Sequence, residues 1–161
     1  MPAFPGDSPQ SPTPMKSARK EHSGARVSGP LKGAERNLAL GFLRDEGYKE
    51  AIQSDDEVYA AWIQTEVVGV VRLALEHGVI VLRGMRVKHD LRSQGIGTLL
   101  LHKLAATLGS QTCYCIPYAW LLEFYGRIGF EKIPVACAPR FLTQRTPDKH
   151  KRGSNADLRI R

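Results

Sequence analysis

The most constraining feature of the sequence is a change of hydrophobic period between residues 79 and 108. Residues 79–87, VIVLRGMRV, are rich in β-branched side chains and predict a β-strand. Residues 96–108 instead carry apolar side chains at three- and four-residue intervals, which predicts an amphipathic helix. Between them, residues 92–97 read RSQGIG, so two glycines stand where the strand gives way to the helix. Glycine lets a backbone approach a ligand closely, and the junction is therefore a candidate binding loop.

This junction predicts a phosphate site. The first amides of a helix lack intrahelical partners, and the helix dipole adds partial positive charge at the same end. Two familiar phosphate motifs do not fit it. The dinucleotide fingerprint needs a glycine where Leu100 stands, and the P-loop needs Gly-Lys-Ser/Thr, which this loop lacks. The pattern that remains is Arg-x-x-Gly-x-Gly, from Arg92 to Gly97.

The surrounding segments predict an α+β domain with one mixed sheet and helices packed on it. A helix is expected from Gly33 to a C-terminal cap at Gly47. Strands at 58–64 and 67–76 form an antiparallel hairpin, which 79–87 extends into a meander. The order strand, helix, strand around the glycine loop predicts a parallel pair with a crossover helix. The later predicted elements are a strand at 112–118, a helix at 119–130, a strand at 130–133, a short helix within 138–149 with Pro139 in its first turn, and a closing strand at 156–161.

Composition sets the domain limits and the classes of partner. Residues 1–30 are dense in Pro and Ser and predict a disordered tail, apart from a short strand near Ala25–Val27, so the folded domain is expected at 31–161. The formal net charge is +7, but many basic residues lie near the ends, which favours solvated charge over specific nucleic-acid binding. No apolar run approaches the roughly 18 residues of a membrane span. Three cysteines favour a reducing, cytoplasmic location, and no Cys/His cluster has the spacing of a metal site.

Two segments resemble the signatures of the GNAT superfamily of N-acetyltransferases, which use acetyl-CoA. Residues 82–104, LRGMRVKHDLRSQGIGTLLLHKL, resemble the family's fourth strand, its pyrophosphate loop and the helix that follows. Residues 121–133, LLEFYGRIGFEKI, resemble its second signature, a helix with Phe-Tyr followed by Gly-Phe entering a strand. The resemblance is close over 58–133 and looser over 30–57 and 134–161. It implies a three-layer αβα fold, with a mixed, mostly antiparallel sheet, helices on both faces and a splayed central strand pair.

The resemblance also implies which residues bind acetyl-CoA. Backbone groups of Met85, Arg86 and Val87 would pair with the pantetheine arm, and an amide there would polarise the thioester carbonyl. The pyrophosphate would be held by the amides of the loop, from Arg92, Ser93, Gln94, Gly95, Ile96, Gly97 and Thr98. Tyr118 stands where many family members carry a cofactor-contacting Asn, so we expect Tyr118 to touch the cofactor in a different way.

For catalysis, the resemblance implies that Tyr125 protonates the leaving thiolate as a general acid. The acceptor would be a primary amine, on a small molecule or a peptide, that attacks the thioester directly in a ternary complex. Residues 79–87 lack the Glu that many relatives use as the base, so Glu76 is the nearest candidate. Arg83 is a candidate for binding an anionic group of the acceptor, because a regular strand would place it on the same face as Met85.

Functions from other classes stay open at this point. A non-catalytic acyl-CoA-binding module would share the same loop but lack turnover, and nucleic-acid binding is suggested by net charge alone. The sequence does not identify the acceptor, and it is compatible with a monomer or a homodimer.

Overall fold

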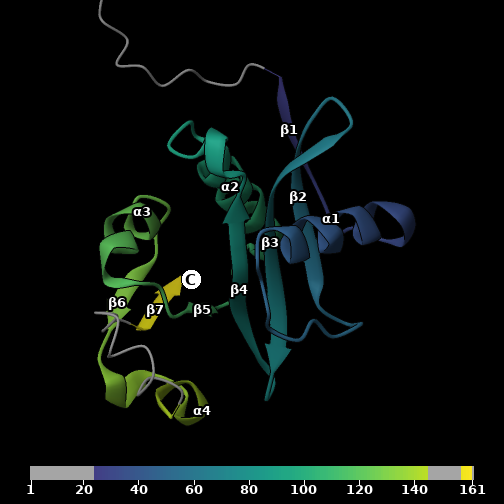
Figure 1. Ribbon diagram of the computed structural model, residues 1–161. Coiled ribbons are helices and arrows are strands. Elements are labelled where there is room, and N and C mark those ends of the chain that lie inside the picture. Colours follow the sequence, from purple (N-terminus) through teal and green to yellow (C-terminus); the bar gives the residue numbers. More distant parts are fainter. Residues whose placement is uncertain (1–23, 145–156, 161) are drawn as a thin grey trace, which may run out of the picture.

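The computed structural model of this protein describes residues 24–144 and 157–160. The strands form one seven-stranded sheet in the order β1-β2-β3-β4-β5-β7-β6 (Figure 1). In chain order the elements are β1 (Ala25–Ser28), α1 (Gly33–Asp45), β2 (Glu57–Ile63), β3 (Glu66–Glu76), β4 (Val79–Val87), the 3₁₀ turn η1 (His89–Leu91), α2 (Ile96–Leu108), β5 (Cys113–Cys115), η2 (Ala119–Leu121), α3 (Leu122–Gly126), β6 (Glu131–Ile133), η3 (Val135–Cys137), α4 (Arg140–Thr143) and β7 (Asp157–Ile160).

The first four strands form the antiparallel meander that the sequence predicts. β2 and β3 pair along their lengths and meet in a tight turn, where Gln64 has a φ of +54°. β1 pairs with β2 and is the short strand that the sequence predicts near Ala25–Val27, although the folded domain was expected to begin at residue 31. The sheet therefore begins before residue 31, and the disorder predicted for residues 1–23 lies outside the described part of the chain.

Helices cover both faces of the sheet (Figure 1). α1 packs on one face over an apolar cluster that includes Leu43, Trp62 and Val70. α4 covers the same face further along, where Leu142 and Val81 share a smaller cluster. α2 and α3 cover the opposite face. Their buried cluster comprises Tyr59, Ala61, Val68, Val71, Leu73, Leu82, Ile96, Leu100, Leu101, Leu104, Leu108, Cys113, Cys115, Tyr125 and Phe130.

The central strands β4 and β5 are parallel and stay together only at their start. Ile80 pairs with Cys113 and Val81 with Tyr114, and the ladder between these two strands ends there. β4 continues to Val87, so most of its length faces β5 without pairing to it. This is the splayed pair that the family resemblance implies, and it leaves backbone groups on one edge of β4 available to a ligand.

A bulge at Gly84 changes which face each β4 side chain occupies. Between the pairs Arg72–Arg83 and Val70–Arg86, β3 has one residue and β4 has two. Arg83 and Arg86 therefore both lie on the α1 face, while Met85 packs into the cluster under α2. The prediction that Arg83 shares a face with Met85 is wrong, because it assumed a regular two-residue alternation.

Two helical predictions differ from the structure in detail. Residues 119–130 do not form one continuous helix; a 3₁₀ turn, η2, leads into the short helix α3, which ends at Gly126. Pro139 is the N-cap residue of α4 rather than a residue of its first turn. Among the described helices, none has the length and apolarity needed to cross a membrane.

Candidate active site

The bulge of β4 is held by an aromatic side chain from the loop that follows α1. Gly84 has a φ of +61°, and a β-carbon there would lie 2.9 Å from the hydroxyl oxygen of Tyr48. A side chain at residue 84 would thus be both strained and in collision with this ring. Tyr48 in turn donates a hydrogen bond to Glu50 (3.1 Å) and accepts one from Arg72 (2.7 Å). The bulge is therefore fixed by the loop above it.

Tyr125 occupies the point where β4 and β5 separate. Its hydroxyl donates to Sδ of Met85 on β4 at 3.7 Å, and it also lies beside the thiol of Cys115 on β5. Its ring packs edge-on against Phe124 and Phe130, with centroids 5.2 and 5.5 Å away. Burial raises the pKa of Tyr125 well above its usual value, and the hydrogen bond with Cys115 adds to the shift. The phenol therefore stays protonated at neutral pH, the state that a proton donor requires.

The glycine loop presents its amides at the start of α2. Gly95 is the N-cap residue in a left-handed conformation, with a φ of +87°. The first bond of the helix is donated by Leu99 to the Gly95 carbonyl (3.0 Å), so the amides of Gly95 to Thr98 lie outside the helical ladder. Apart from Gly95 itself and its two chain neighbours, no atom of the described residues lies within 4 Å of the position a β-carbon of Gly95 would take. Open space beside unpaired amides fits a phosphate group.

Arg92 has a different role from that of a simple phosphate-facing cation. Its backbone amide donates to the His89 carbonyl (3.3 Å), and its Nε donates to the Val87 carbonyl (3.1 Å). One guanidinium nitrogen lies 3.7 Å from the carboxylate of Glu46 at the end of α1. The side chain thus ties the loop to the end of β4, and the loop amides from Gly95 onward are the better candidates for anion binding.

Gly97 lies where the loop meets Met85 of β4 and Phe124 of α3. A β-carbon at Gly97 would lie 3.1 Å from Cε of Met85 and 3.1 Å from Cζ of Phe124. The missing side chain lets α2 pack closely on β4 and α3 together. The second glycine of the motif is therefore a packing residue, whereas Gly95 provides the turn.

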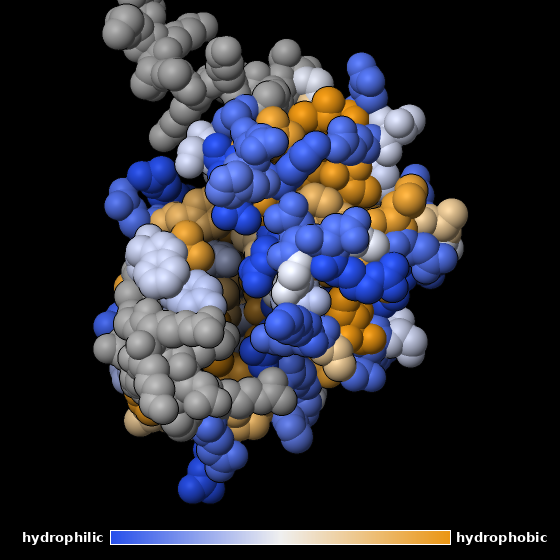
Figure 2. Space-filling model, viewed as in Figure 1, coloured by the Kyte–Doolittle hydropathy of each residue, from blue (hydrophilic) through white to orange (hydrophobic). Residues whose placement is uncertain are grey.

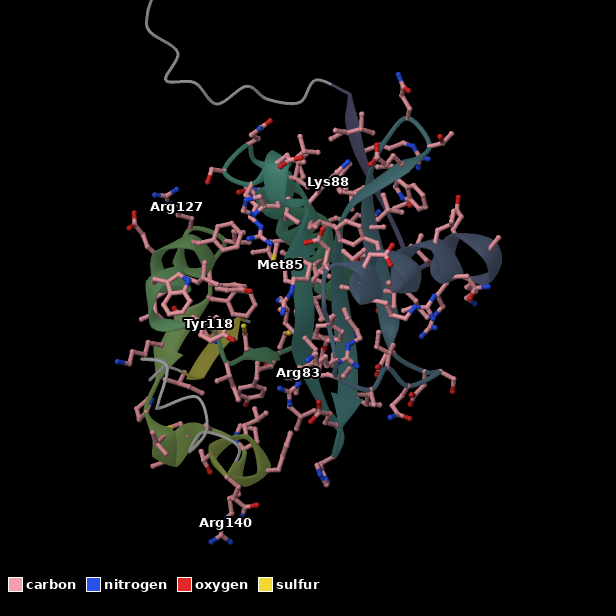
Figure 3. All side chains as sticks on the ribbon, in the orientation of Figure 1. Arg83, Met85, Lys88, Tyr118, Arg127 and Arg140 are labelled. Atoms are coloured by element: carbon pink, nitrogen blue, oxygen red, sulfur yellow. The ribbon has the colours of Figure 1, made fainter. Side chains whose placement is uncertain are left out.

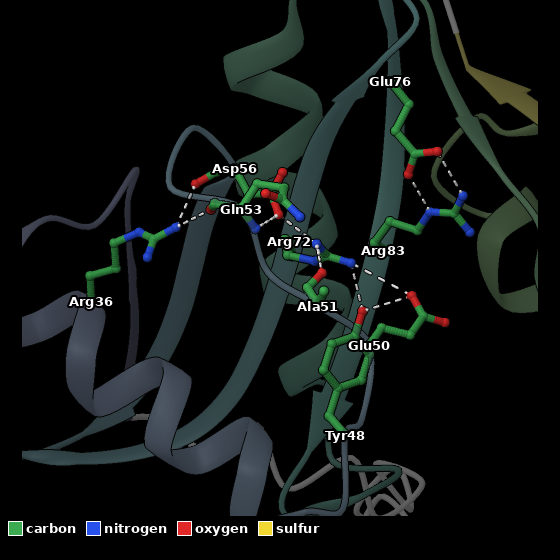
Figure 4. Close-up of polar contacts among 9 residues, drawn as sticks. All are labelled: Arg36, Tyr48, Glu50, Ala51, Gln53, Asp56, Arg72, Glu76 and Arg83. Atoms are coloured by element: carbon green, nitrogen blue, oxygen red, sulfur yellow. Dashed lines mark hydrogen bonds and ion pairs between the residues drawn. The ribbon is translucent and has the colours of Figure 1, made fainter.

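The α1 face of the sheet carries three arginines close to the bulge, and Figure 4 shows how two of them are neutralised. Arg83 donates to both carboxylate oxygens of Glu76, at 2.9 and 3.1 Å. Arg83 is 7% exposed, so the pair is largely shielded from water. Arg72 donates to Asp56 (2.5 Å) and to the Ala51 carbonyl (3.1 Å). The third arginine, Arg86, lies on the same face.

A cleft of about 460 Å³ lies where loop 50–56 meets the end of β3. Its lining combines three carboxylates with one arginine and with neutral polar and apolar residues; the residues are Glu50, Ala51, Gln53, Asp56, Arg72, Ala74, Leu75, Glu76 and His77. The cleft follows β3 rather than the splay between β4 and β5. Glu76 thus borders the cleft and also contacts Arg83 on β4.

The opposite wall of the splay carries two stacked aromatic rings. Tyr118 and Trp120 lie parallel within 3°, with centroids 4.6 Å apart, and Trp120 is 67% exposed. Figure 3 shows Tyr118 on the segment after β5, across from Met85 and Arg83 on β4. In Figure 2 the surface is hollowed between these two sides, with apolar atoms in the hollow and hydrophilic residues along the β4 side. Tyr118 thus lies across the splay from β4, while its contact with a cofactor stays a prediction.

Sequence reasoning missed the support beneath the bulge. Tyr48, Arg72 and Asp56 were not singled out, although they fix Gly84 and the loop after α1. One signal was present: Arg72 interrupts the apolar run VVGVVRLAL of residues 67–75. A charged residue inside a strand that is otherwise buried requires a partner of opposite charge.

Comparisons with known proteins agree with this geometry. Residues 20–140 match the family model described as an acetyltransferase (GNAT) domain. No curated protein sequence matches the chain significantly. Among solved structures, an acyl-CoA N-acyltransferase from Pseudomonas aeruginosa has a TM-score of 0.60 at 17% identity, covering 85% of this chain and 98% of that one.

Two further structures of similar fold were solved with ligands. Arabidopsis thaliana Naa50, in complex with the bisubstrate analogue CoA-Ac-MVNAL, has a TM-score of 0.59 at 15% identity, covering 86% of this chain and 99% of that one. N-acetylglutamate synthase from Neisseria gonorrhoeae, complexed with coenzyme A and N-acetyl-glutamate, has a TM-score of 0.57 at 14% identity, covering 85% of this chain and 35% of that one. At these identities the likeness establishes the fold, and the matched domain model establishes the family. The chain belongs to the GNAT family of acetyltransferases.

Proposed function

We propose that this protein is an acetyl-CoA-dependent N-acetyltransferase that acts on a primary amine, on a small molecule or a peptide, by direct attack in a ternary complex. The observation that carries the proposal is the position of Tyr125. Its protonated hydroxyl lies between Met85 and Cys115, where β4 and β5 part and where α2 brings the glycine loop close. A thioester carbonyl placed at the β4 edge would have its sulfur near this donor.

On the donor side, groups of this chain hold and orient acetyl-CoA. Backbone groups of Met85, Arg86 and Val87 pair with the pantetheine arm along the open edge of β4. The loop 92–98 holds the pyrophosphate, chiefly through the amides from Gly95 to Thr98. Tyr118 contacts the cofactor from the opposite wall. When bound, acetyl-CoA supplies an acyl group activated by its thiol leaving group.

Tyr125 assists departure of the thiolate. A thiol has a pKa of about 8.5, below that of an ordinary tyrosine at about 10. Because burial raises the pKa of Tyr125 further, its hydroxyl donates a hydrogen bond to the sulfur more readily than it gives up its proton completely. This role stabilises negative charge on the sulfur as it develops.

Glu76 is the proposed base, with Arg83 as its partner. Replacing Glu76 with Gln should lower kcat/KM at pH 7 by about 10²-fold, since the ammonium form of the acceptor then loses its proton without help. The defect should shrink as the pH approaches the pKa of the acceptor amine. Glu123→Gln is the control, because Glu123 also pairs with an arginine, Arg127, but on an exposed helix. A pH–rate profile that Glu76→Gln leaves unchanged would remove Glu76 from the mechanism.

Acetyl-CoA should stabilise the protein against heat. At a ligand concentration of 100 times Kd, linkage adds about 2.7 kcal/mol to the free energy of unfolding, which corresponds to a Tm increase of roughly 5–10 °C. Differential scanning fluorimetry with acetyl-CoA and CoA measures this, with adenosine as the ligand that lacks the pyrophosphate. The absence of any shift at saturating acetyl-CoA contradicts the proposal.

A non-catalytic acyl-CoA-binding module is the second candidate. It is favoured by the engagement of Glu76 with Arg83 and by Tyr118 at the position of the family's Asn. Thiol release in the presence of a panel of amines separates the two, because both bind acetyl-CoA and only the enzyme turns it over. We also propose a cytoplasmic location, on the basis of the sparse cysteines.

A further inference from the structure

Arg86 differs from the other two arginines on the α1 face of the sheet. Arg72 is paired with Asp56, and Arg83 is paired with Glu76. Among the side chains described within residues 24–144, no carboxylate forms an ion pair with Arg86, although it is half-buried. A partly buried charge in a protein is normally paired or bound to a ligand. Arg86 is thus the arginine beside the bulge whose positive charge the described residues leave uncompensated.

The guanidinium of Arg86 is held in place by its neighbours. One of its terminal nitrogens donates to the Met85 carbonyl at 3.0 Å. Its central carbon lies 5.6 Å from the centroid of the Tyr48 ring, within the range of a cation–π contact. The same ring packs against Gly84, so Arg86 is positioned by the contacts that fix the bulge. A preorganised guanidinium loses little freedom when it binds a further group.

The position of Arg86 points to the acceptor rather than to the donor. Its ladder partner, Val70, belongs to the cluster beneath α1. The next pair, Val87 with Gly69, faces α2, because Gly69 contacts Ile96 at the start of that helix. Arg86 and the phosphate loop therefore lie on opposite faces of the sheet.

The charge of Arg86 also reaches the proposed reaction centre. Burial raises the pKa of the Tyr125 hydroxyl, and the positive charge of Arg86 acts against that shift by lowering it. Such an effect requires that the two groups lie within electrostatic range of each other. A group of the acceptor that is bound by Arg86 would consequently lie close to Tyr125, where the attacking amine is proposed to react.

We infer that Arg86 binds a carboxylate of the acceptor, so that the preferred acceptors are small amines that carry a carboxylate near the amine, such as free amino acids. This inference rests on the proposed N-acetyltransferase function. An arginine fork matches the geometry of a carboxylate, and four of its five N–H donors remain after the bond to Met85. Arg83 does not take this role, because Glu76 already occupies two of its nitrogens.

The test compares each amino acid with its own carboxamide. Alanine, methionine, glutamate and lysine are assayed beside their α-carboxamides for kcat/KM of thiol release. The protein should favour the carboxylates by about 10- to 100-fold, as expected for a charge-assisted hydrogen-bond pair. Arg86→Gln should bring this ratio close to one through a higher KM for the amine, and Arg86→Lys should retain part of it. Arg44→Gln, which removes one exposed arginine of α1, should leave the ratio unchanged.

A binding measurement keeps the inference testable without turnover. With CoA saturating, the same amino acids should raise the Tm of the protein and should fail to do so for Arg86→Gln. The inference is overturned by equal use of carboxylates and carboxamides with no Tm shift from the amino acids, or by a preference that survives in Arg86→Gln. It is also overturned if Arg86→Gln raises the KM for acetyl-CoA and leaves the ratio intact. Failure of the proposed function has a different signature, since thiol release would then be absent with every amine, whether or not CoA raises the Tm.

Discussion

Replacing Tyr125 with Phe is expected to lower kcat by about 10²-fold, because the hydrogen bond to the leaving sulfur is lost while the binding groups remain. The Phe ring keeps the edge-on packing against Phe124 and Phe130, so the folded structure should be preserved. The Tm increase caused by acetyl-CoA should also be unchanged. Single-turnover measurements at saturating acetyl-CoA give the rate of the chemical step directly.

The pH dependence provides a further check on Tyr125. Its pKa is raised, so the neutral phenol persists through the ordinary alkaline range, and ionisation of Tyr125 should not reduce kcat of the unaltered protein between pH 7 and about 10. Tyr59→Phe is the matched control, since Tyr59 is buried under the same face and donates to Glu57. A chemical step that runs at the same rate in Tyr125→Phe would show that Tyr125 is a packing residue.

Replacing Asp56 with Ala is expected to lower the free energy of unfolding by about 3–5 kcal/mol, because buried Arg72 keeps, among the described carboxylates, only the longer contact with exposed Glu50 at 3.6 Å. The side chains of Asp56 and Arg72 are 3% and 4% exposed. Asp56 also accepts a hydrogen bond from the amide of Gln53 (2.8 Å), so the loop above the bulge would lose an anchor as well. Urea denaturation of the two proteins measures the difference.

Two further variants separate the ion pair from general disruption of the core. The double variant Asp56→Leu with Arg72→Met removes both charges and should recover part of the lost stability. Glu123→Ala breaks an exposed pair with Arg127 and should cost about 0–1 kcal/mol. An Asp56→Ala protein as stable as Glu123→Ala would mean that Glu50, which lies 3.6 Å from Arg72, compensates its charge.

The elements beside the glycine loop were predictable because local chemistry determines them. The strand 79–87 and the helix 96–108 have the predicted bounds, and the two glycines stand at the turn and at the tight packing contact. The signal is strong here because the spacing of apolar residues changes from that of a strand to that of a helix. The two positions at the junction also accept few residues other than glycine. The family signatures predicted which residues bind acetyl-CoA, and the domain match confirms the family.

The surroundings of the Gly84 bulge could not be predicted in the same way, because they depend on contacts between distant segments. The position of Arg83 was inferred from regular alternation, and the extra residue at Gly84 reversed the relation between Arg83 and Met85. That bulge is supported by Tyr48, which lies far away in the sequence. The partner of Glu76 likewise became apparent only when β3 and β4 were paired.

The place of β7 in the sheet has a consequence for how the chain is made. β7 pairs with both β5 and β6, so the wall that carries α3 and Tyr125 is completed by residues 157–160. During synthesis, the meander of β1 to β4 can form well before these residues have emerged. The strands that carry Arg72, Arg83 and Arg86 would then be assembled first, and the wall that carries Tyr125 would be closed last.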